Sequence, residues 1–316
     1  YLLFGSVASG MMLFGMSLLF GASGSLDLTV IQVKLANSQF APLSILASIL
    51  FLAGVGFKIS MAPFHLWAPD VYEGAPTPIT AFLTVGPKAL GFAVLLRILV
   101  MIYPWLGFRW SHMIALLAIV TMTLGNVTAI AQHNVKRLLA YSSIAQAGYI
   151  LMGAAAVTET GITAILVYLL AYAFTNLGAF SVVILVSNHF KNDDLESYTG
   201  LGKRSPFLAA CLTIFLLSLA GIPPLAGFIG KFYVFASVLE SGMVTLAVAA
   251  AINSAIAAYY YFKIVRVMYL VDSKEAEALP QPAPLMIALC LMLVGTLAMG
   301  LAPYPVIAFI KGLLFA

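Results

Sequence analysis

The sequence predicts an all-α integral membrane protein with about nine transmembrane helices, and its composition, apolar windows and proline breaks support this fold class. Hydrophobic residues make up 63% of the 316 residues and charged residues only 8%, with a mean hydropathy of +1.07. Soluble domains contain about 25% charged and about 45–50% apolar residues. The net charge of +4 is spread along the chain, so it does not indicate a nucleic-acid partner.

Apolar windows of about 20 residues, the length that crosses a bilayer, recur along the whole chain. The predicted spans cover residues 2–21, 41–62, 78–103, 110–132, 137–157, 161–187, 206–239, 243–270 and 283–302, followed by a short amphipathic tail at 304–316. The chain starts at Tyr1 without an initiator methionine or a basic region and cleavage site. We therefore expect the later part of a longer, N-terminally truncated membrane protein.

Two proline-rich stretches predict broken helices, at about 58–78 and 218–231. Segment 206–239 is too long for one upright span and too short for two spans with a turn, and its centre reads LAGIPPLAGFIGK. Proline opens a helix, and open backbone at membrane depth must be buried in protein or line a wet cavity. For 62–78, ordinary surface loops are an equal alternative, because Asp70 and Glu73 lie there.

Basic residues fall mainly on one side of the predicted membrane. The loops 22–40, 104–109, 158–160 and 240–243 carry only Lys34 and Arg109. The opposite loops, 133–136, 188–205 and 271–282, carry with their flanking helix ends Lys136, Arg137, Lys191, Lys203, Arg204, Lys263, Arg266 and Lys274. The positive-inside rule places the second set in the cytoplasm.

Three lysines, Lys58, Lys88 and Lys231, lie within apolar stretches, where each ammonium costs about 2.5–3.5 kcal/mol. Lys88 is ten residues into its span, near mid-membrane, where burial disfavours the charged form. It is a candidate proton carrier, with a carboxylate-paired structural lysine as the alternative. Lys58 is nearer its helix end and could snorkel to the surface. Lys231 follows the second break, whose opened carbonyls could hold water or accept its protons.

Other polar residues accompany the lysines. His65, seven residues after Lys58, could relay protons or bond to backbone. A polar stripe within 137–157 could bind helices together or hold water; its members are Tyr141, Ser142, Ser143, Gln146 and Tyr149. The sequence has no dinucleotide or Walker A motif and no bis-histidine pattern for haem, and we expect Cys211 and Cys290 to be small buried hydrophobes. We therefore expect no metal and no redox chemistry in this chain.

Three blocks of sequence carry a family resemblance: FKISMAPFHLWAPDVYEGAPTPITAFL, NVKRLLAYSSIAQAGYILMG and SLAGIPPLAGFIGKFYVF. Together they resemble the antiporter-like, proton-translocating subunits of bacterial NADH-quinone oxidoreductase (respiratory complex I), and most of all the subunit N (subunit 2) family.

The resemblance implies fourteen helices in two inverted five-helix repeats, each with a broken helix, of which this chain would hold helices six to fourteen. Residues 1–103 would complete the first repeat, 104–271 would form the second, and 272–316 the last helix and tail. The family's proton-path lysines on helices seven, eight and twelve match Lys58, Lys88 and Lys231. Lysine rather than glutamate at the last position argues against subunit M. A glutamate on helix five, which pairs with the helix-seven lysine, would lie upstream of this chain.

The function implied is proton translocation through these lysines, coupled to electron transfer from NADH to quinone. NADH, FMN, the Fe–S clusters and quinone would belong to partner subunits. The expected neighbours are subunit M, small membrane subunits and the lipid of a bacterial inner membrane, or of a thylakoid membrane for a cyanobacterial or plastid protein. The alternatives are a subunit of a multisubunit Na⁺/H⁺ antiporter and a non-conducting membrane scaffold.

Overall fold

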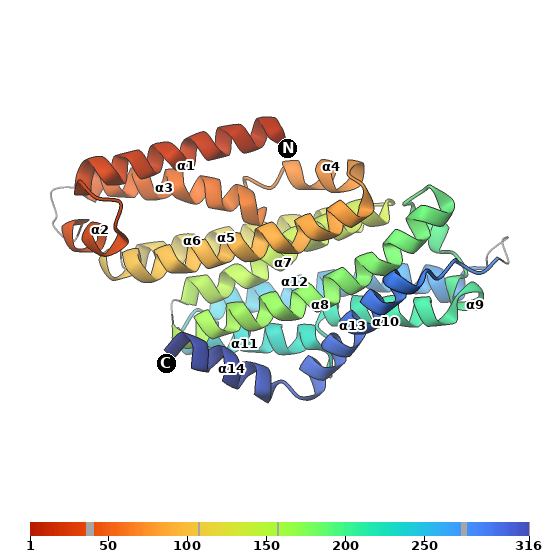
Figure 1. Cartoon of the computed structure of the whole chain (residues 1–316). Coiled ribbons are helices and arrows are strands. Elements are labelled where there is room, and N and C mark those ends of the chain that lie inside the picture. The colour runs from red at the N-terminus through yellow and green to blue at the C-terminus, as the bar shows by residue number, and fades with distance from the viewer. Residues whose placement is uncertain (36–40, 107, 157, 273–276, 316) are drawn as a thin grey trace.

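A computed structural model describes the chain except for residues 36–40, 107, 157, 273–276 and 316, and shows a bundle of long helices (Figure 1). Across the described residues the only β-type pairing is an isolated bridge between Asn134 and Asp194. The helices are α1 Leu2–Ser23, α2 Leu28–Leu35, α3 Ala41–Ile59, α4 Trp67–Gly74, α5 Thr77–Leu106, α6 Phe108–Ile130, α7 Val135–Ala156, α8 Glu159–Phe190, the 3₁₀ helix η2 Leu195–Tyr198, α9 Leu201–Arg204, α10 Pro206–Ala220, α11 Ala226–Glu240, α12 Val244–Leu270, α13 Ala283–Leu301 and α14 Tyr304–Phe315.

The predicted membrane spans are confirmed. Eight helices of the described chain are long and apolar enough to cross a membrane: α1, α3, α5, α6, α7, α8, α12 and α13. The ninth predicted span, 206–239, forms α10 and α11, which have 15 residues each. At 1.5 Å per residue each is shorter than the bilayer core of about 30 Å. The two half-helices together therefore occupy the place of one broken span.

The first break also lies inside the protein. Helix α3 ends at Ile59, and α4 begins at Trp67 after seven non-helical residues. The Trp67 indole Nε1 donates a hydrogen bond to the Phe57 carbonyl, 3.0 Å away, and so satisfies one of the acceptors that the end of α3 leaves open. Trp67 and Tyr72 are buried, and α4 packs on α7. These contacts favour the broken helix over the surface-loop alternative.

Helix α7 is the centre of the bundle, and 94% of the residues in its 18-residue apolar stretch are buried. It packs against α4, α6, α8 and α11 (Figure 1). The backbones of α6 and α7 approach so closely that a Cβ on Gly148 would lie 2.6 Å from the Met122 nitrogen, and one on Gly125 would lie 2.6 Å from the Ala145 nitrogen. Small residues allow such contact between membrane helices, so the polar stripe of α7 faces other helices rather than lipid.

The loops gather at two ends, as predicted. At one end the Val135 nitrogen donates to the Asp193 carbonyl at 2.7 Å, and Lys203 pairs with Asp272. At the other end the Ser241 hydroxyl donates to the Ala156 carbonyl at 3.1 Å. Of the charges used for the orientation, Lys274 and the side chain of Arg109 lie outside the described residues. The first end is the one that the positive-inside rule assigns to the cytoplasm.

Candidate functional site

Lys231 lies against the second break. Helix α10 ends at Ala220, and Gly221 turns the chain with a φ of 91° that favours glycine. The Lys231 Nζ donates to the Ala220 carbonyl at 2.9 Å and to the Ser254 hydroxyl at 3.3 Å. It also lies 4.5 Å from the centre of the Tyr149 ring. The residue is 6% exposed. The open C-terminal end of α10 thus serves as a buried acceptor for a cation.

The break is held in place by contacts between the two half-helices. The Gly227 nitrogen donates to the Ser218 hydroxyl at 2.9 Å, and a Cβ on Gly227 would lie only 1.8 Å from the Ser218 carbonyl oxygen. Thr175 of α8 shares a hydrogen bond with the same hydroxyl. The opened backbone is therefore satisfied inside the protein, as membrane depth requires.

Lys88 lies in the middle of the bundle on α5 and is 2% exposed. Its Nζ donates to the Ser143 carbonyl at 2.7 Å and to the Ser143 hydroxyl at 2.5 Å. The same hydroxyl accepts a hydrogen bond from Tyr172 of α8. The four ion pairs of the described chain involve other residues, so the carboxylate-paired alternative for Lys88 finds no acid in this part of the protein.

The stripe on α7 reaches from one buried lysine to the other. Ser143 contacts Lys88, and Tyr149 lies beneath Lys231; six residues of helix separate these contacts by about 9 Å. Gln146 lies between them. Its Nε2 donates to the Leu219 carbonyl at 3.0 Å and to the Tyr261 hydroxyl at 3.2 Å, and its Oε1 accepts from Tyr168 at 2.5 Å. Of the remaining stripe members, Ser142 pairs with the Tyr261 hydroxyl.

Lys58 is exposed, in contrast to the other two lysines. Its Nζ donates to the Tyr1 hydroxyl at 3.4 Å and lies 5.8 Å from the ring centres of Tyr1 and Phe57. The expected relay His65 is buried in the first break, and its Nδ1 has no hydrogen-bond partner among the described residues. The hydrogen bonds of the described chain do not connect His65 with Lys58, so the structure does not bring these two candidates together.

Sequence reasoning missed the partners that other helices supply. Tyr168, Tyr172, Ser254 and Tyr261 complete the contacts of the lysines and of Gln146. Each is a polar residue within an apolar span, which is a weak signal. A second group of polar side chains is hydrogen-bonded to the Tyr149 hydroxyl through Asn126. Asn126 donates to this hydroxyl and also bonds to Asn253 and Tyr260.

The two cysteines do not share one environment. Cys211 is buried, as expected, but Cys290 is exposed; the prediction that both are buried is wrong for Cys290. The reason is that Cys290 lies on α13, where only 22% of the residues in the apolar stretch are buried against other helices. In the described chain no three His, Cys, Asp or Glu side chains gather in a way that could hold a metal ion.

The fold is that of a multi-span membrane protein with continuous and broken helices. Lys88 and Lys231 are buried among these helices, and neither forms an ion pair with a described residue. The family model described as NADH:quinone oxidoreductase/Mrp antiporter, TM, matches residues 1–257. The chain therefore belongs to this family of membrane proteins.

Relatives with curated names agree. The chain is 44% identical over 313 residues to NADH-quinone oxidoreductase subunit N of Trichlorobacter lovleyi, covering 98% of the chain and 64% of that relative. It is 45% identical over 318 residues to NAD(P)H-quinone oxidoreductase subunit 2 of Synechococcus elongatus, covering 96% and 61% respectively. The chain thus spans somewhat less than two thirds of the length of these relatives.

Solved structures share the fold. A chain of respiratory complex I from Thermus thermophilus with bound aureothin matches with a TM-score of 0.84 and 37% identity, covering 98% of this chain and 67% of that one. A chain of the archaeal membrane-bound sulfane sulfur reductase matches with a TM-score of 0.91 and 27% identity, covering 98% and 63%. A chain of the Mrp complex from Dietzia sp., at 22% identity, shares the fold with a TM-score of 0.86, covering 98% and 66%.

Proposed function

We propose that this chain forms part of a proton-translocating membrane subunit of an NADH-quinone oxidoreductase. The observation that carries the proposal is the polar stripe of α7, which contacts buried Lys88 at one position and buried Lys231 at another. The naming of relatives as subunit N supports the choice of enzyme. Electron transfer from NADH to quinone would take place in other subunits.

In this proposal each lysine holds a proton in turn. A proton from the cytoplasmic side would reach Lys58, with His65 as a relay near the first break, and would pass to Lys88. Ser143, Gln146 and the tyrosines around them would hold water between Lys88 and Lys231. Because charge at one amine disfavours charge at the next, loading one lysine would push the proton of its neighbour onward.

The proposed organisation keeps the division expected from the family. Residues 1–103 would belong to the first inverted repeat, 104–271 would form the second, and 272–316 would add the last helix and tail. The open side of Lys58 would be closed by an acidic partner from a preceding helix. The neighbours would be subunit M and small membrane subunits in a bacterial inner membrane, or the corresponding subunits in a thylakoid.

NADH, FMN, the Fe–S clusters and quinone would be held by partner subunits. The contribution of this chain would be to hold and move protons.

A subunit of a multisubunit Na⁺/H⁺ antiporter is the second candidate, because the same family model covers Mrp antiporters and the Dietzia Mrp chain has the same fold. Sodium-dependent proton exchange by the complete protein, measured in cells that lack NADH-quinone oxidoreductase, would favour that candidate. A non-conducting scaffold is a poorer explanation, since it gives no reason to bury an amine that lacks a carboxylate.

The test uses the complete protein in its assembled enzyme. Lys88→Met should reduce the number of protons pumped per electron while the complex still assembles, because the methionine fills the space but cannot hold a proton. Lys203→Met is the matched control, since Lys203 is exposed at the end of the bundle. Pumping by the Lys88→Met enzyme equal to that of the control would contradict the proposal.

A further inference from the structure

Buried polar side chains continue from Lys231 behind Tyr149. The Tyr149 hydroxyl accepts a hydrogen bond from Asn126 Nδ2 at 3.0 Å, and Asn126 Oδ1 accepts from the Tyr260 hydroxyl at 3.0 Å. Asn253 adds a contact of 3.1 Å to Asn126. Asn126 and Tyr260 are completely buried. A buried polar network is costly unless every member is satisfied, and the role of this one is not explained by the contacts between Lys88 and Lys231.

The network runs toward the end of the bundle that the positive-inside rule places in the cytoplasm. On α12, Ser254 contacts Lys231, and Tyr260 and Lys263 follow about 9 Å and about 13 Å further toward the C-terminal end of the helix. Lys263 is one turn beyond Tyr260, on the same face. Its Nζ donates to the Gln132 carbonyl at 3.1 Å and reaches the Ile130 carbonyl at 3.5 Å, at the end of α6.

Helix α7 offers no such continuation in the opposite direction. After Tyr149 it reads ILMGAAA to its end at Ala156. These residues carry no side-chain hydroxyl, amide or charge that could order water. The polar surroundings of Lys231 on this central helix therefore lead to the same end as Asn126, Tyr260 and Lys263.

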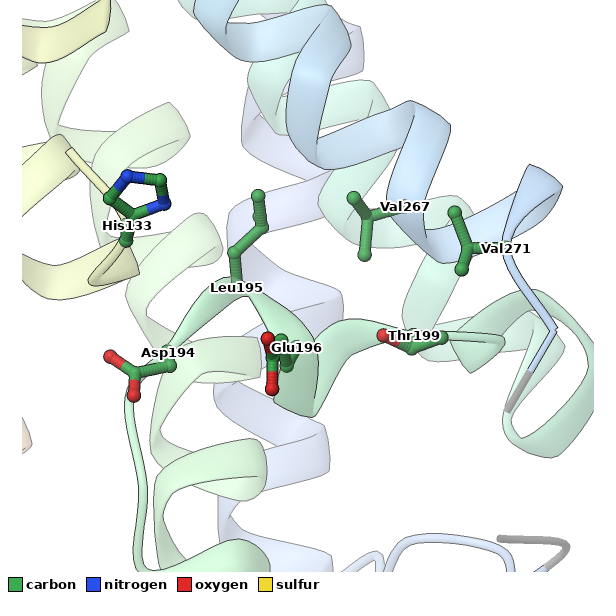
Figure 2. Close-up of a pocket in the computed structure, with 7 residues that line it drawn as sticks. All are labelled: His133, Asp194, Leu195, Glu196, Thr199, Val267 and Val271. Atoms are coloured by element: carbon green, nitrogen blue, oxygen red, sulfur yellow. The ribbon is translucent and has the colours of Figure 1, made fainter. Parts of the chain in front are cut away.

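A surface pocket lies at the same end of the bundle (Figure 2). It has a volume of about 420 Å³ and is lined by His133, Asp194, Leu195, Glu196, Thr199, Val267 and Val271. Figure 2 shows its three titratable side chains coming from two segments, His133 from the α6–α7 connection and the two acids from the stretch around η2. His133 directly follows Gln132, whose carbonyl accepts from Lys263, so the turn that binds Lys263 also contributes to the pocket.

We propose that the pocket, Lys263 and the Tyr260–Asn126–Tyr149 network form a second proton route, which reaches Lys231 from the cytoplasmic end without passing Lys88. The inference rests on the proposed function. His133, Asp194 and Glu196 would collect protons from bulk water, and Lys263, which binds the turn that carries His133, would receive them next. The Tyr260 and Tyr149 hydroxyls would each take a proton from water on one side while releasing their own to water on the other. The Lys231 amine is the final acceptor and becomes an ammonium, and Asn126 is a positioning residue that holds the two hydroxyls.

The experiment compares single and double variants of the complete protein in its assembled enzyme, reconstituted into phospholipid vesicles, by protons pumped per electron. The decrease in protons pumped per electron caused by Lys231→Met measures the full contribution of Lys231. Lys88→Met and Tyr260→Phe should each cause only part of that loss, and together they should reproduce it. Asn126→Leu should match Tyr260→Phe and add nothing to it, because both changes act on one route.

Tyr72→Phe is the matched control, since Tyr72 is also a completely buried tyrosine, with its hydroxyl bonded to the Leu83 carbonyl. If Lys88→Met alone equals Lys231→Met, and Tyr260→Phe behaves like Tyr72→Phe, the second route does not exist and the proposed function stands. If Lys231→Met and Lys88→Met both leave pumping unchanged, the proposed function fails and the second route fails with it.

Discussion

The two broken helices of this bundle hold their lysines in different surroundings. At the second break Lys231 is enclosed by α7 and α12, and its Nζ bonds to the freed Ala220 carbonyl. At the first break Lys58 is exposed, and among the described residues it contacts the Tyr1 hydroxyl and two aromatic rings. A break in a helix thus makes a charge site only when neighbouring helices close over it. Within the described chain the Lys231 site is complete, and the Lys58 site is open on one side.

The largest difference between the breaks should appear when their glycines are replaced. Gly227→Ala would put a Cβ 1.8 Å from the Ser218 carbonyl oxygen, which cannot move without shifting α10. We expect destabilisation at or above the upper end of the usual range for overpacking, about 1–3 kcal/mol, measured as a loss of thermal stability in lipid or detergent.

Gly56→Ala at the first break should lower the thermal stability less than Gly227→Ala does. A Cβ on Gly56 would meet the Met61 methyl group at 2.8 Å and the Phe64 ring at 2.9 Å, and side chains can move aside. Gly10→Ala on α1 is the control, since nothing lies within 4 Å of the added Cβ. Equal stability of the Gly227→Ala and Gly10→Ala proteins would contradict the packing described for the second break.

Removing the lysines should also separate the two sites. Lys231→Met leaves the buried Ala220 carbonyl without its donor, and an unsatisfied buried acceptor costs about 1–3 kcal/mol. Lys58→Met removes only an exposed contact of 3.4 Å, and surface substitutions usually change stability by less than about 0.5 kcal/mol. Thermal unfolding of the two variants tests which one loses more stability. A larger loss for Lys58→Met than for Lys231→Met would contradict the comparison of the two sites.

Ser143→Ala should have an intermediate effect. The change removes the hydroxyl that accepts from both Lys88 and Tyr172, but Lys88 keeps the Ser143 carbonyl. We expect a loss of stability of about 1–2 kcal/mol, mainly from the unpaired Tyr172 hydroxyl. Ser6→Ala is the control, because Ser6 is exposed and bonds only within its own helix. A Ser143→Ala protein as stable as the control would show that this contact does not hold α5, α7 and α8 together.

The smallest effect is expected at the exposed end of the bundle. The hydrogen bond from Lys203 lowers the pKa of Asp272 below its ordinary value of 3.8. A lowered pKa favours the folded state above the ordinary value, and this contribution is lost as the pH falls. Both side chains are more than three quarters exposed, so Asp272→Asn should leave thermal stability at neutral pH unchanged.

Lys136→Met should lower thermal stability more than Asp272→Asn does, since the Lys136 side chain is 5% exposed and pairs with Asp193.

The sequence predicted most of the spans and the burial of Lys88 and Lys231, because lipid demands long apolar helices and makes an interrupted or charged one conspicuous. It also predicted the stripe on α7, whose members lie on one helix at helical spacing. It could not predict that Tyr168, Tyr172 and Tyr261 meet this stripe, because these contacts depend on how separate helices pack. Cys290 was misplaced for the same reason, since hydropathy does not distinguish a lipid-facing side of a helix from a protein-facing one.

The link between the two buried lysines is the central claim, and Gln146 tests it most directly. Gln146→Met keeps the length of the side chain but removes its contacts with Leu219, Tyr168 and Tyr261; Gln32→Met on α2 is the control. In the assembled enzyme we expect Gln146→Met to lower the protons pumped per electron as much as Lys88→Met does, with no further loss when the two changes are combined. Pumping equal to that of the Gln32→Met enzyme would contradict transfer between Lys88 and Lys231 along α7.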